Sequence, residues 1–448
     1  MTYPDEQSSS KALYQRARRS LPGGNTRSIV YMSPYPIYAV RGCGCRVWDR
    51  DNVSRIDCLN NFTSLIHGHA HPEVTRAVCE QVSMGSAFGL PTESEVELAE
   101  LLCQRVASIE KLVFNNSGTE AVMMAIRAAR AFTGRQKIAK VEGAYHGSYD
   151  YAEVSLDPSP EAWGDPPSSL PYARGIPTPV LNDVVTIPFN NCAKSEELIR
   201  KQCSELAAVL IDPMPNRVGL IPADQDYLRM LRRVTTDIGA VLVFDEVISF
   251  RLGYNGTQAI WGTQADITAM GKVIGGGFPV GAVGGRSEIM ALFDASKAKP
   301  AIPVEGTYCG NPVTMRAGLA TMRLLDQSAF TKLNKMGDQV RSGIAEAFRH
   351  LGVVGQVVGA GSLLRVHFTD RSLRDYRSAF PSKEEADMVA TFHRYLLNRG
   401  ILAARSGMIA LSTAMTDDEI AEIVEAASGA IQAVAGRHLT RHVTAQSS

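Results

Sequence analysis

The chain has 448 residues, of which 45% are hydrophobic and 21% charged, and its 46 lysines and arginines balance 46 aspartates and glutamates. This length can bury a large core, either as two or three domains or as one large domain with an appendage. The zero net charge gives no indication of nucleic-acid or membrane binding. We find no signal peptide and no apolar run that could cross a bilayer, and the eight scattered cysteines fit free thiols. We therefore expect a cytoplasmic protein.

The N-terminal part predicts short elements. Helical spacing covers 9–20 and stops at Pro22-Gly23-Gly24. A polar turn at 49–52 predicts a hairpin, with short strands at 37–40, 46–48 and 55–59. Two helices follow, at 72–84 and 92–106, and the second has a possible capping box made by Thr92 and Glu95.

From residue 111 to 285 the pattern alternates between strand and helix. Strands are expected at 111–114, 137–141, 184–187, 207–211, 240–244, 267–270 and 280–283. Helices are expected at 119–132, 195–204 and 224–238. This alternation predicts a mainly parallel sheet covered by helices. The segment 155–181, rich in proline, serine and glycine, is expected to be a long loop that acts as a lid or binding loop or is mobile.

After residue 312 the pattern predicts a smaller α+β domain. Helices are expected from 312 to 325 and at 330–351, 383–399 and 417–434, and strands at 353–358, 363–368 and 408–411. Residues 437–448 are polar and are expected to form a frayed tail.

Asp245 and Lys272 carry the first chemical signal. The apolar strand 240–244 ends in Asp245, and Lys272 follows the next apolar segment between glycines. Ligands of open α/β sheets bind beyond the carboxyl ends of the strands. An acid that keeps a heterocyclic nitrogen protonated, with a lysine amine nearby, suits pyridoxal phosphate chemistry. Many α/β enzymes have a strand ending in aspartate, however, and most lysines are surface charges, so the pair alone leaves both interpretations open.

A phosphate site is possible where the helix 119–132 begins. Backbone N–H groups at a helix N-terminus, beside Ser117, Gly118 and Thr119, can bind an anion. Ser117 and Glu120 also have capping-box spacing, which needs no ligand. The two interpretations are compatible, because a phosphate can share a capped helix end.

The segment Tyr145-His146-Gly147 follows the strand 137–141. Its tyrosine either stacks on an aromatic cofactor or is a half-buried loop side chain. The alternating His67, His69 and His71 could share one face of a strand as metal ligands. Because the residues around them indicate a turn, and Cys43-Gly44-Cys45 has no partner pair, we expect no metal site.

Taken together, the motifs resemble those of class III pyridoxal phosphate-dependent aminotransferases. The matching segments are Ser117-Gly118-Thr119-Glu120, Tyr145-His146-Gly147, Asp245-Glu246-Val247, Gly271-Lys272-Val273-Ile274-Gly275-Gly276-Gly277 and Gly306-Thr307-Tyr308-Cys309-Gly310-Asn311-Pro312. Their order and spacing match from about residue 21 to 434. Within the class, the chain is most similar to β-amino-acid aminotransferases of the β-phenylalanine type and to glutamate-1-semialdehyde 2,1-aminomutases.

The resemblance implies the fold type I of these enzymes, with pyridoxal 5′-phosphate as the cofactor. It implies a large domain at 61–312 with a mainly parallel seven-stranded sheet. Residues 313–436 would form a smaller α+β domain to which residues 1–60 contribute, followed by the tail at 437–448. It also implies a homodimer with shared active sites and small-molecule partners, an amino acid and a keto acid.

The resemblance also assigns roles around the cofactor ring. Lys272 would hold the cofactor as a Schiff base and act as the general base, and Asp245 would pair with the pyridine nitrogen. Val247 and Tyr145 would pack on opposite faces of the ring. His146 belongs to the same cofactor-binding motif as Tyr145.

Further roles concern the phosphate and the substrate. The phosphate would be held by Ser117, Gly118 and Thr119, and Thr307 would reach the phosphate of the neighbouring subunit's cofactor. Arg27 matches an arginine that binds the substrate carboxylate in both subfamilies, and Arg405 matches a second arginine of the β-amino-acid aminotransferases. Either arginine could instead form a surface salt bridge.

Two features depart from the family pattern. Asp212-Pro213 stands where Glu-Pro is usual, and Asn216-Arg217 makes the position of an asparagine found in aminomutases ambiguous. The second feature weakens the aminomutase interpretation. Because Arg27 and Arg405 could bind a carboxylate in two positions, we expect transfer of an amino group from a β- or other non-α-amino acid to a keto acid such as 2-oxoglutarate or pyruvate. The alternative is a glutamate-1-semialdehyde 2,1-aminomutase, which keeps one carbon skeleton in the site.

Overall fold

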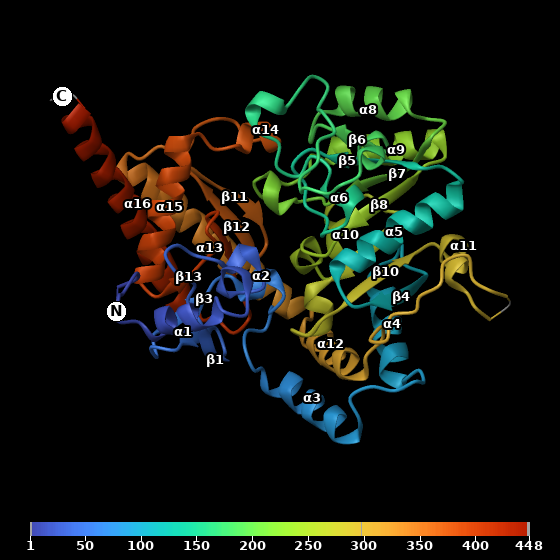
Figure 1. Cartoon of the computed structure of the whole chain (residues 1–448), viewed down its shortest axis with the longest axis horizontal. Helices are drawn as coiled ribbons and strands as arrows, with labels where there is room; N and C mark the ends of the chain where they lie inside the picture. Colours follow the sequence, from blue (N-terminus) through green and yellow to red (C-terminus); the bar gives the residue numbers. More distant parts are fainter. Residues whose placement is uncertain (1, 297, 446–448) are drawn as a thin grey trace.

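The computed structural model describes residues 2–296 and 298–445, with side chains as far as residue 436. Figure 1 shows two halves: the N-terminal strands and C-terminal helices gather on one side, and the large central sheet lies on the other. Within the described residues, no helix has the length and apolar character of a membrane span.

The central sheet has seven strands. In spatial order they are β4 (Lys111–Asn115), β10 (Gly281–Gly285), β9 (Ile267–Gly271), β8 (Val241–Asp245), β7 (Leu206–Ile211), β5 (Lys137–Val141) and β6 (Val184–Ile187). β10 is antiparallel to both of its neighbours, and the other pairs are parallel. The predicted mainly parallel seven-stranded sheet is confirmed.

β7 is apolar along its whole length, and β8 is apolar as far as Phe244, because helices cover both faces of the sheet. Val209, Ile211, Leu242 and Phe244 share a core with α8 (Cys192–Lys201) and α9 (Gln225–Ile238). The residues between them, Ala208, Leu210, Val241 and Val243, pack on α5 (Gly118–Thr133). Alternate side chains of a strand point to opposite faces, so two separate cores hold the sheet. Each large apolar side chain contributes roughly 1.5–3 kcal/mol by its burial.

The two ends of the chain share one sheet. Its order is β1 (Ala39–Cys43), β2 (Arg46–Asp49), β3 (Ser54–Asp57) and β13 (Ile401–Leu402). A separate three-stranded sheet consists of β11 (Gln356–Ala360), β12 (Leu363–His367) and β14 (Met408–Ala410). The long helices α13 (Gln327–Leu351), α15 (Lys383–Asn398) and α16 (Asp417–Ala445) complete this half of the molecule.

Shorter elements connect these layers. The other α-helices are α1 (Ser9–Ala17), α2 (Asn60–Thr63), α3 (Pro72–Met84), α4 (Glu93–Arg105), α6 (Asp150–Glu153), α7 (Thr178–Asn182), α10 (Gly256–Trp261), α11 (Ser287–Met290), α12 (Pro312–Leu324) and α14 (Tyr376–Ala379). The 3₁₀ helices are η1 (Pro22–Gly24), η2 (Ser28–Val30), η3 (Pro160–Ala162), η4 (Asn216–Val218), η5 (Ser249–Leu252), η6 (Lys272–Gly275) and η7 (Ala291–Phe293).

Several predicted boundaries are wrong. α16 continues to Ala445, so most of the predicted tail is helical, and the rest of that tail lies outside the described residues. α8 begins at Cys192 rather than 195, because the Asn191 side chain caps it by accepting a hydrogen bond from the Lys194 N–H at 3.1 Å. Thr92 makes no capping hydrogen bond with α4. The 155–181 segment is not wholly a loop, since it contains η3 and most of α7.

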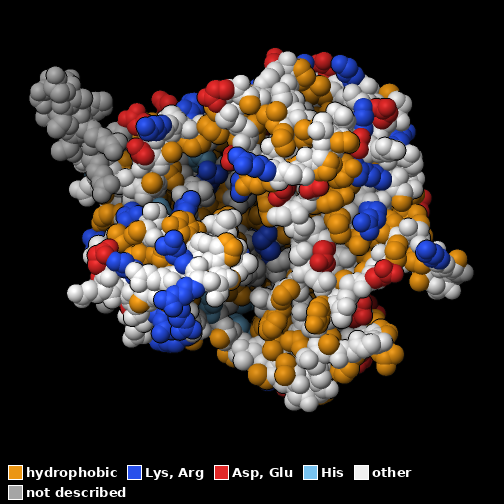
Figure 2. Space-filling model, in the orientation of Figure 1, with side chains coloured by type: hydrophobic (Ala, Val, Ile, Leu, Met, Phe, Trp, Pro, Cys, Tyr) orange, Lys and Arg blue, Asp and Glu red, His pale blue; other side chains and the backbone are white. Residues whose placement is uncertain are grey.

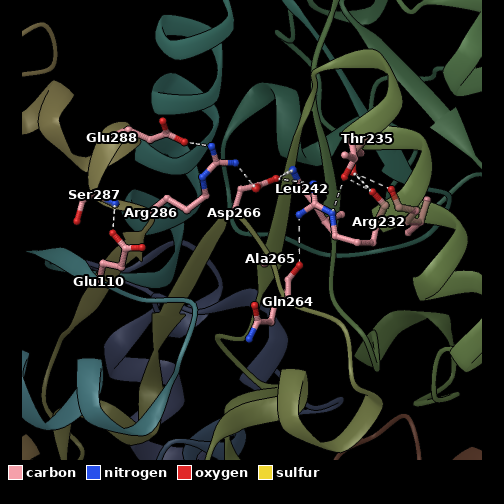
Figure 3. Close-up of polar contacts among 12 residues, drawn as sticks. Glu110, Arg232, Thr235, Leu242, Gln264, Ala265, Asp266, Arg286, Ser287 and Glu288 are labelled. Atoms are coloured by element: carbon pink, nitrogen blue, oxygen red, sulfur yellow. Dashed lines mark hydrogen bonds and ion pairs between the residues drawn. The ribbon is translucent and has the colours of Figure 1, made fainter.

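Asp266, at the N-terminal end of β9, is a buried carboxylate with partners from the protein itself. Asp266 accepts hydrogen bonds from the Leu242 N–H and from Arg286, both at 2.8 Å, and Arg232 lies 3.0 Å away (Figure 3). Two cations and a backbone donor thus satisfy this buried carboxylate. The opposite edge of the sheet, where Asp245 ends β8, is arranged differently.

Candidate active site

Lys272 and Asp245 come from neighbouring parallel strands. Asp245, the last residue of β8, is paired in register with Ala269 of β9, and Lys272 begins η6 directly after β9. Lys272 has a left-handed backbone with φ of 51°. Such a conformation costs a non-glycine residue of order 1–3 kcal/mol and is concentrated at functional sites. Among the described residues, none hydrogen-bonds or forms an ion pair with the Lys272 amine.

Asp245 is oriented by two hydrogen bonds. Its Oδ1 accepts from the Val247 N–H at 3.0 Å, and its Oδ2 lies 2.7 Å from Nδ1 of His146, whose side chain is fully buried. An ionised carboxylate only accepts hydrogen bonds, so Nδ1 of His146 is the donor. Burial lowers the pKa of His146, although Asp245 acts in the opposite direction. The neutral ring therefore leaves Nε2 without a proton, and this buried atom has no partner within the described chain.

Asp212 adds a second buried carboxyl group to the same edge of the sheet. It follows β7, and its Oδ1 accepts a hydrogen bond from the Met214 N–H at 3.0 Å. Burial, together with the negative charge of Asp245, raises the pKa of Asp212 to about 8. Asp212 therefore keeps its proton at neutral pH.

The amine of Lys272 loses its proton more easily than an ordinary lysine. Burial lowers its pKa, the charges of Asp245 and Asp212 oppose that change, and Arg27 reinforces it. A larger neutral fraction makes the amine a better nucleophile and base.

The N-terminus of α5 lies beside this pair. Ser117 caps the helix, because its Oγ accepts a hydrogen bond from the Glu120 N–H at 3.1 Å. The carboxylate of Glu120 reaches the Asn116 N–H at 2.7 Å rather than that of Ser117, so the predicted capping box is shifted by one residue. A Cβ on Gly118 would lie 2.7 Å from Val247, which excludes any larger residue there.

Thr119 and Tyr145 belong to contacting segments. Oγ1 of Thr119 accepts a hydrogen bond from the Ser148 N–H at 3.2 Å, which ties the loop of Tyr145 and His146 to the start of α5. Tyr145 is 36% exposed, so its ring has a free side. Thr307 lies in an exposed turn, where a Cβ on the preceding Gly306 would come within 3.1 Å of Asn116. The structure thus brings the predicted phosphate residues and Thr307 to the same end of α5.

The two predicted substrate arginines line a cavity of about 700 Å³. Arg27 donates a hydrogen bond to Asn61 Oδ1 at 2.7 Å, and Arg405 donates one to the Tyr31 carbonyl at 2.6 Å. Neither guanidinium has a carboxylate partner in the described part of the chain. A hollow separates the two halves of the molecule in Figure 2, and lysine and arginine side chains lie along it. Lys272 and Asp245 do not line this cavity.

Sequence reasoning missed several residues of this region. Arg217 and Arg365 also line the cavity, and Asn61 holds Arg27. Arg217 could have been found from its place in the sequence, because it follows β7 at the same sheet edge as Asp212. Arg365 lies inside β12, where an arginine gives no local signal.

These residues fit pyridoxal phosphate. The strained Lys272 offers an amine without a partner, and Asp245 offers a buried, oriented carboxylate for a ring nitrogen. Gly118 leaves the end of α5 free of a side chain, where backbone N–H groups suit a phosphate. The orphaned Nε2 of His146 shows that the pocket around Asp245 is not satisfied by the described protein atoms alone.

Comparisons with known proteins agree with this chemistry. The aminotransferase class-III family model matches residues 30–431. A glutamate-1-semialdehyde 2,1-aminomutase of Methanothermobacter thermautotrophicus is 38% identical over 423 residues, which cover 93% of this chain and 97% of the relative.

Two solved structures are also similar. An ω-transaminase from Sphaerobacter thermophilus is 49% identical with a TM-score of 0.94, covering 96% of this chain and 99% of that one. A β-phenylalanine aminotransferase from Variovorax paradoxus is 33% identical with a TM-score of 0.85, covering 94% and 93%. The chain therefore belongs to the class-III aminotransferases and is a pyridoxal phosphate-dependent enzyme with their fold.

Proposed function

We propose that this enzyme transfers the amino group of a β- or other non-α-amino acid to a keto acid such as 2-oxoglutarate or pyruvate. The observation that carries the proposal is that Arg27 and Arg405 line one cavity from different elements, and no described carboxylate pairs with either of them. A transaminase must accept two different carboxylic acids in turn. Two arginine forks allow the carboxylate of each acid to bind at its own distance from the reacting carbon.

The site geometry supports a set of cofactor-binding roles. We infer that Asp245 keeps the pyridine nitrogen protonated and that His146 holds Asp245 in place through its Nδ1–H. Val247 and Tyr145 would pack against the two faces of the ring. Ser117, Gly118 and Thr119, at the N-terminus of α5, would hold the phosphate.

Proton transfer is assigned to Lys272. Pyridoxal phosphate, when bound, supplies an electron sink that stabilises negative charge at the amino-bearing carbon of the substrate. Lys272 would hold the cofactor covalently before substrate binds. Its neutral amine would then be the base that removes the proton from the amino-bearing carbon of the substrate. The same amine would deliver that proton to a second position, in a 1,3-proton shift.

The similar ω-transaminase and β-phenylalanine aminotransferase support intermolecular transfer. The test is a screen of amine donors with and without an added keto acid, using the purified holoenzyme. We expect turnover of β-amino acids only when the keto acid is present. Failure to form a new amino acid from any keto acid would contradict the proposal.

A second candidate is the intramolecular exchange of glutamate-1-semialdehyde to 5-aminolevulinate. The observation that favours it is the 38% identity to a curated aminomutase. The same screen decides between the two reactions, because the aminomutase needs no acceptor. Efficient formation of 5-aminolevulinate without a keto acid would replace the transaminase assignment.

We further propose that the enzyme is a homodimer and that residues 61–312 form its large domain. Residues 313–436 form the small domain, together with residues 1–60. Large apolar side chains stand exposed on α3 and on the segment after it, among them Met84 at 65%, Phe88 at 50% and Leu90 at 77%. Clustered exposed apolar residues support an interface.

Subunit mixing tests the shared site. If Thr307 serves the partner's cofactor, Lys272→Ala and Thr307→Ala subunits place both lesions in one site of a heterodimer and leave the other intact. We expect mixtures of the two inactive variants to recover activity. Folded variants that associate without recovering activity would contradict the arrangement.

A further inference from the structure

The substrate cavity contains more positive charge than two carboxylate anchors require. Besides Arg27 and Arg405, it is lined by Arg217 and Arg365, and none of the four forms an ion pair with a described residue. The carboxylates in the cavity are engaged elsewhere. Asp49 pairs with Arg55 at 2.6 Å, Asp57 lies 2.7 Å from His69, and Asp157 accepts a hydrogen bond from Tyr376 at 3.1 Å.

Arg365 donates hydrogen bonds to the backbone next to both Arg217 and Arg405. Its Nη1 donates to the Asn216 carbonyl at 3.2 Å, next to Arg217, and its Nε donates to the Ser406 carbonyl at 3.1 Å, next to Arg405. Burial, reinforced by the charge of Arg217, lowers the pKa of Arg365 to about 10. Arg365 remains charged at neutral pH, so the group of arginines is held together without a compensating anion from the described chain.

Arg217 is the member whose donors are free for a ligand. Its guanidinium carbon lies 5.8 Å from the centre of the Tyr145 ring and 5.6 Å from that of Tyr172. No described residue accepts a hydrogen bond from its N–H groups. Because Tyr145 belongs to the loop that carries His146, this cation lies beside the proposed cofactor site. The half-buried guanidinium is thus oriented by two aromatic rings, with no acceptor for its N–H groups.

We propose that Arg217, supported by Arg365, binds a second carboxylate of the substrate, so that the enzyme favours dicarboxylic over monocarboxylic amino and keto acids. This assignment rests on the proposed amino transfer. Arg27 and Arg405 take the carboxylate nearer the reacting carbon, and Arg217 takes the distal one. A planar guanidinium with unused donors matches a carboxylate better than an ammonium group would.

The test compares binding of unreactive acids to the holoenzyme by calorimetry. Glutarate carries two carboxylates and butyrate one, and neither has an amino or keto group that could react. We expect glutarate to bind the native enzyme at least about tenfold more tightly than butyrate, a difference of about 1.4 kcal/mol that one additional charged pair can supply. Arg217→Gln should weaken glutarate binding by about tenfold and change butyrate binding by less than about twofold.

Two further variants make the result specific. Arg217→Lys keeps the charge but not the fork and should recover only part of the glutarate affinity. Arg229→Gln removes a cation from the exposed surface of α9, where Arg229 pairs with Asp226, and should change neither affinity. The KM for 2-oxoglutarate should rise in Arg217→Gln while that for pyruvate stays constant.

The outcomes separate this inference from the proposed reaction. Equal affinity for glutarate and butyrate in the native enzyme, or equal weakening of both by Arg217→Gln, would overturn the second carboxylate site. An enzyme that binds glutarate through Arg217 but transfers no amino group to any keto acid would keep the site and lose the transaminase assignment.

Discussion

Lys272 differs from a surface lysine in three ways. Its backbone is left-handed, its amine has no partner among the described residues, and burial lowers its pKa. Each property costs stability, and together they are explained by a covalent and catalytic use of the amine.

Replacing Lys272 tests this interpretation. We expect Lys272→Ala to lower the rate at least about 100-fold, because the base is lost. Borohydride should fix the cofactor on Lys272 of the native enzyme, as peptide mass spectrometry would show, and on no residue of the variant. Lys201→Ala, at the exposed end of α8, is the control. Cofactor fixed on another lysine of the native enzyme would refute the assignment.

Arg27 and Arg405 allow a separate kinetic prediction. Removing the charged partner of a bound carboxylate costs roughly 2–5 kcal/mol. Arg27→Ala or Arg405→Ala should therefore raise the KM of the amino donor, the keto acid or both, by about 30-fold or more. Unchanged KM values in both variants, measured beside Arg229→Gln, would show that the carboxylates bind elsewhere.

Residue chemistry was partly predictable from sequence. Lys272 and Asp245 stand at the ends of apolar strands, so their place at one sheet edge follows from the pattern. Arg217 also follows a strand of this sheet, but Arg365 could not be ranked above other arginines, because its significance lies in the lack of a nearby carboxylate. The surroundings of Arg365 depend on segments about 150 residues apart in the chain, such as the one that contains Asn216.

At the scale of elements, α14 links the two halves of the molecule near the cofactor loop. Arg377 forms a double hydrogen bond with Glu142, at 2.7 and 2.9 Å, and Tyr376 donates to Asp157 at 3.1 Å. A Cβ on Gly143 would lie only 2.0 Å from the Tyr376 ring. α14 thus packs directly on the segment that leads to Tyr145 and His146.

Breaking this ion pair should affect both folding and cofactor binding. The Glu142 side chain is 4% exposed and that of Arg377 is 28% exposed. Removing one partner of a buried pair costs 3–5 kcal/mol, and the partial exposure of Arg377 reduces this to about 2–3 kcal/mol. We expect Arg377→Met to lower the free energy of unfolding by that amount and to weaken pyridoxal phosphate binding.

The neighbouring Arg374 provides the control. Its side chain is 69% exposed and lies 4.0 Å from Asp224. Arg374→Met should change neither quantity measurably in urea denaturation and cofactor titration. Similar losses in both variants would mean that the buried pair has no particular role.

Prediction from sequence succeeded for long elements, in which the hydrophobic pattern extends over many residues, and failed for short elements. The strand β7 is apolar throughout and β8 is apolar as far as Phe244, and α13 shows helical spacing over many turns. α14 has only four residues after its Asp375 cap, which is too short for a helical hydrophobic pattern to repeat. β13 has two residues and exists because it pairs with β3.

For the molecule as a whole, buried histidines should set the stability at acid pH. Burial lowers the pKa of His67, His367 and His393 to about 4 in each case. His67 and His367 each lie within hydrogen-bond distance of a backbone carbonyl, those of Thr321 and Gly219. The folded state resists protonation that the unfolded chain accepts near pH 6.5. Stability is therefore fully present above pH 6.5 and falls as the pH drops toward 4.

Denaturation by urea at several pH values checks this expectation. At pH 5 each histidine should cost about 2 kcal/mol relative to pH 7. His393→Gln, which cannot take up a proton, should make the loss between pH 7 and pH 5 smaller by that amount. His350→Gln, on the exposed side of α13, is the comparison. An identical pH dependence in the native protein and both variants would exclude this cause.

The pairing of β8 with β9 has a consequence for how the chain can vary in length. Because successive side chains alternate between faces, one residue inserted within β9 would turn Lys272 away from Asp245. An extra residue after Arg174, in an exposed stretch, leaves that register untouched. Covalent attachment of the cofactor should survive the second insertion and not the first. Natural insertions and deletions should accordingly accumulate in such exposed connections and spare these two strands.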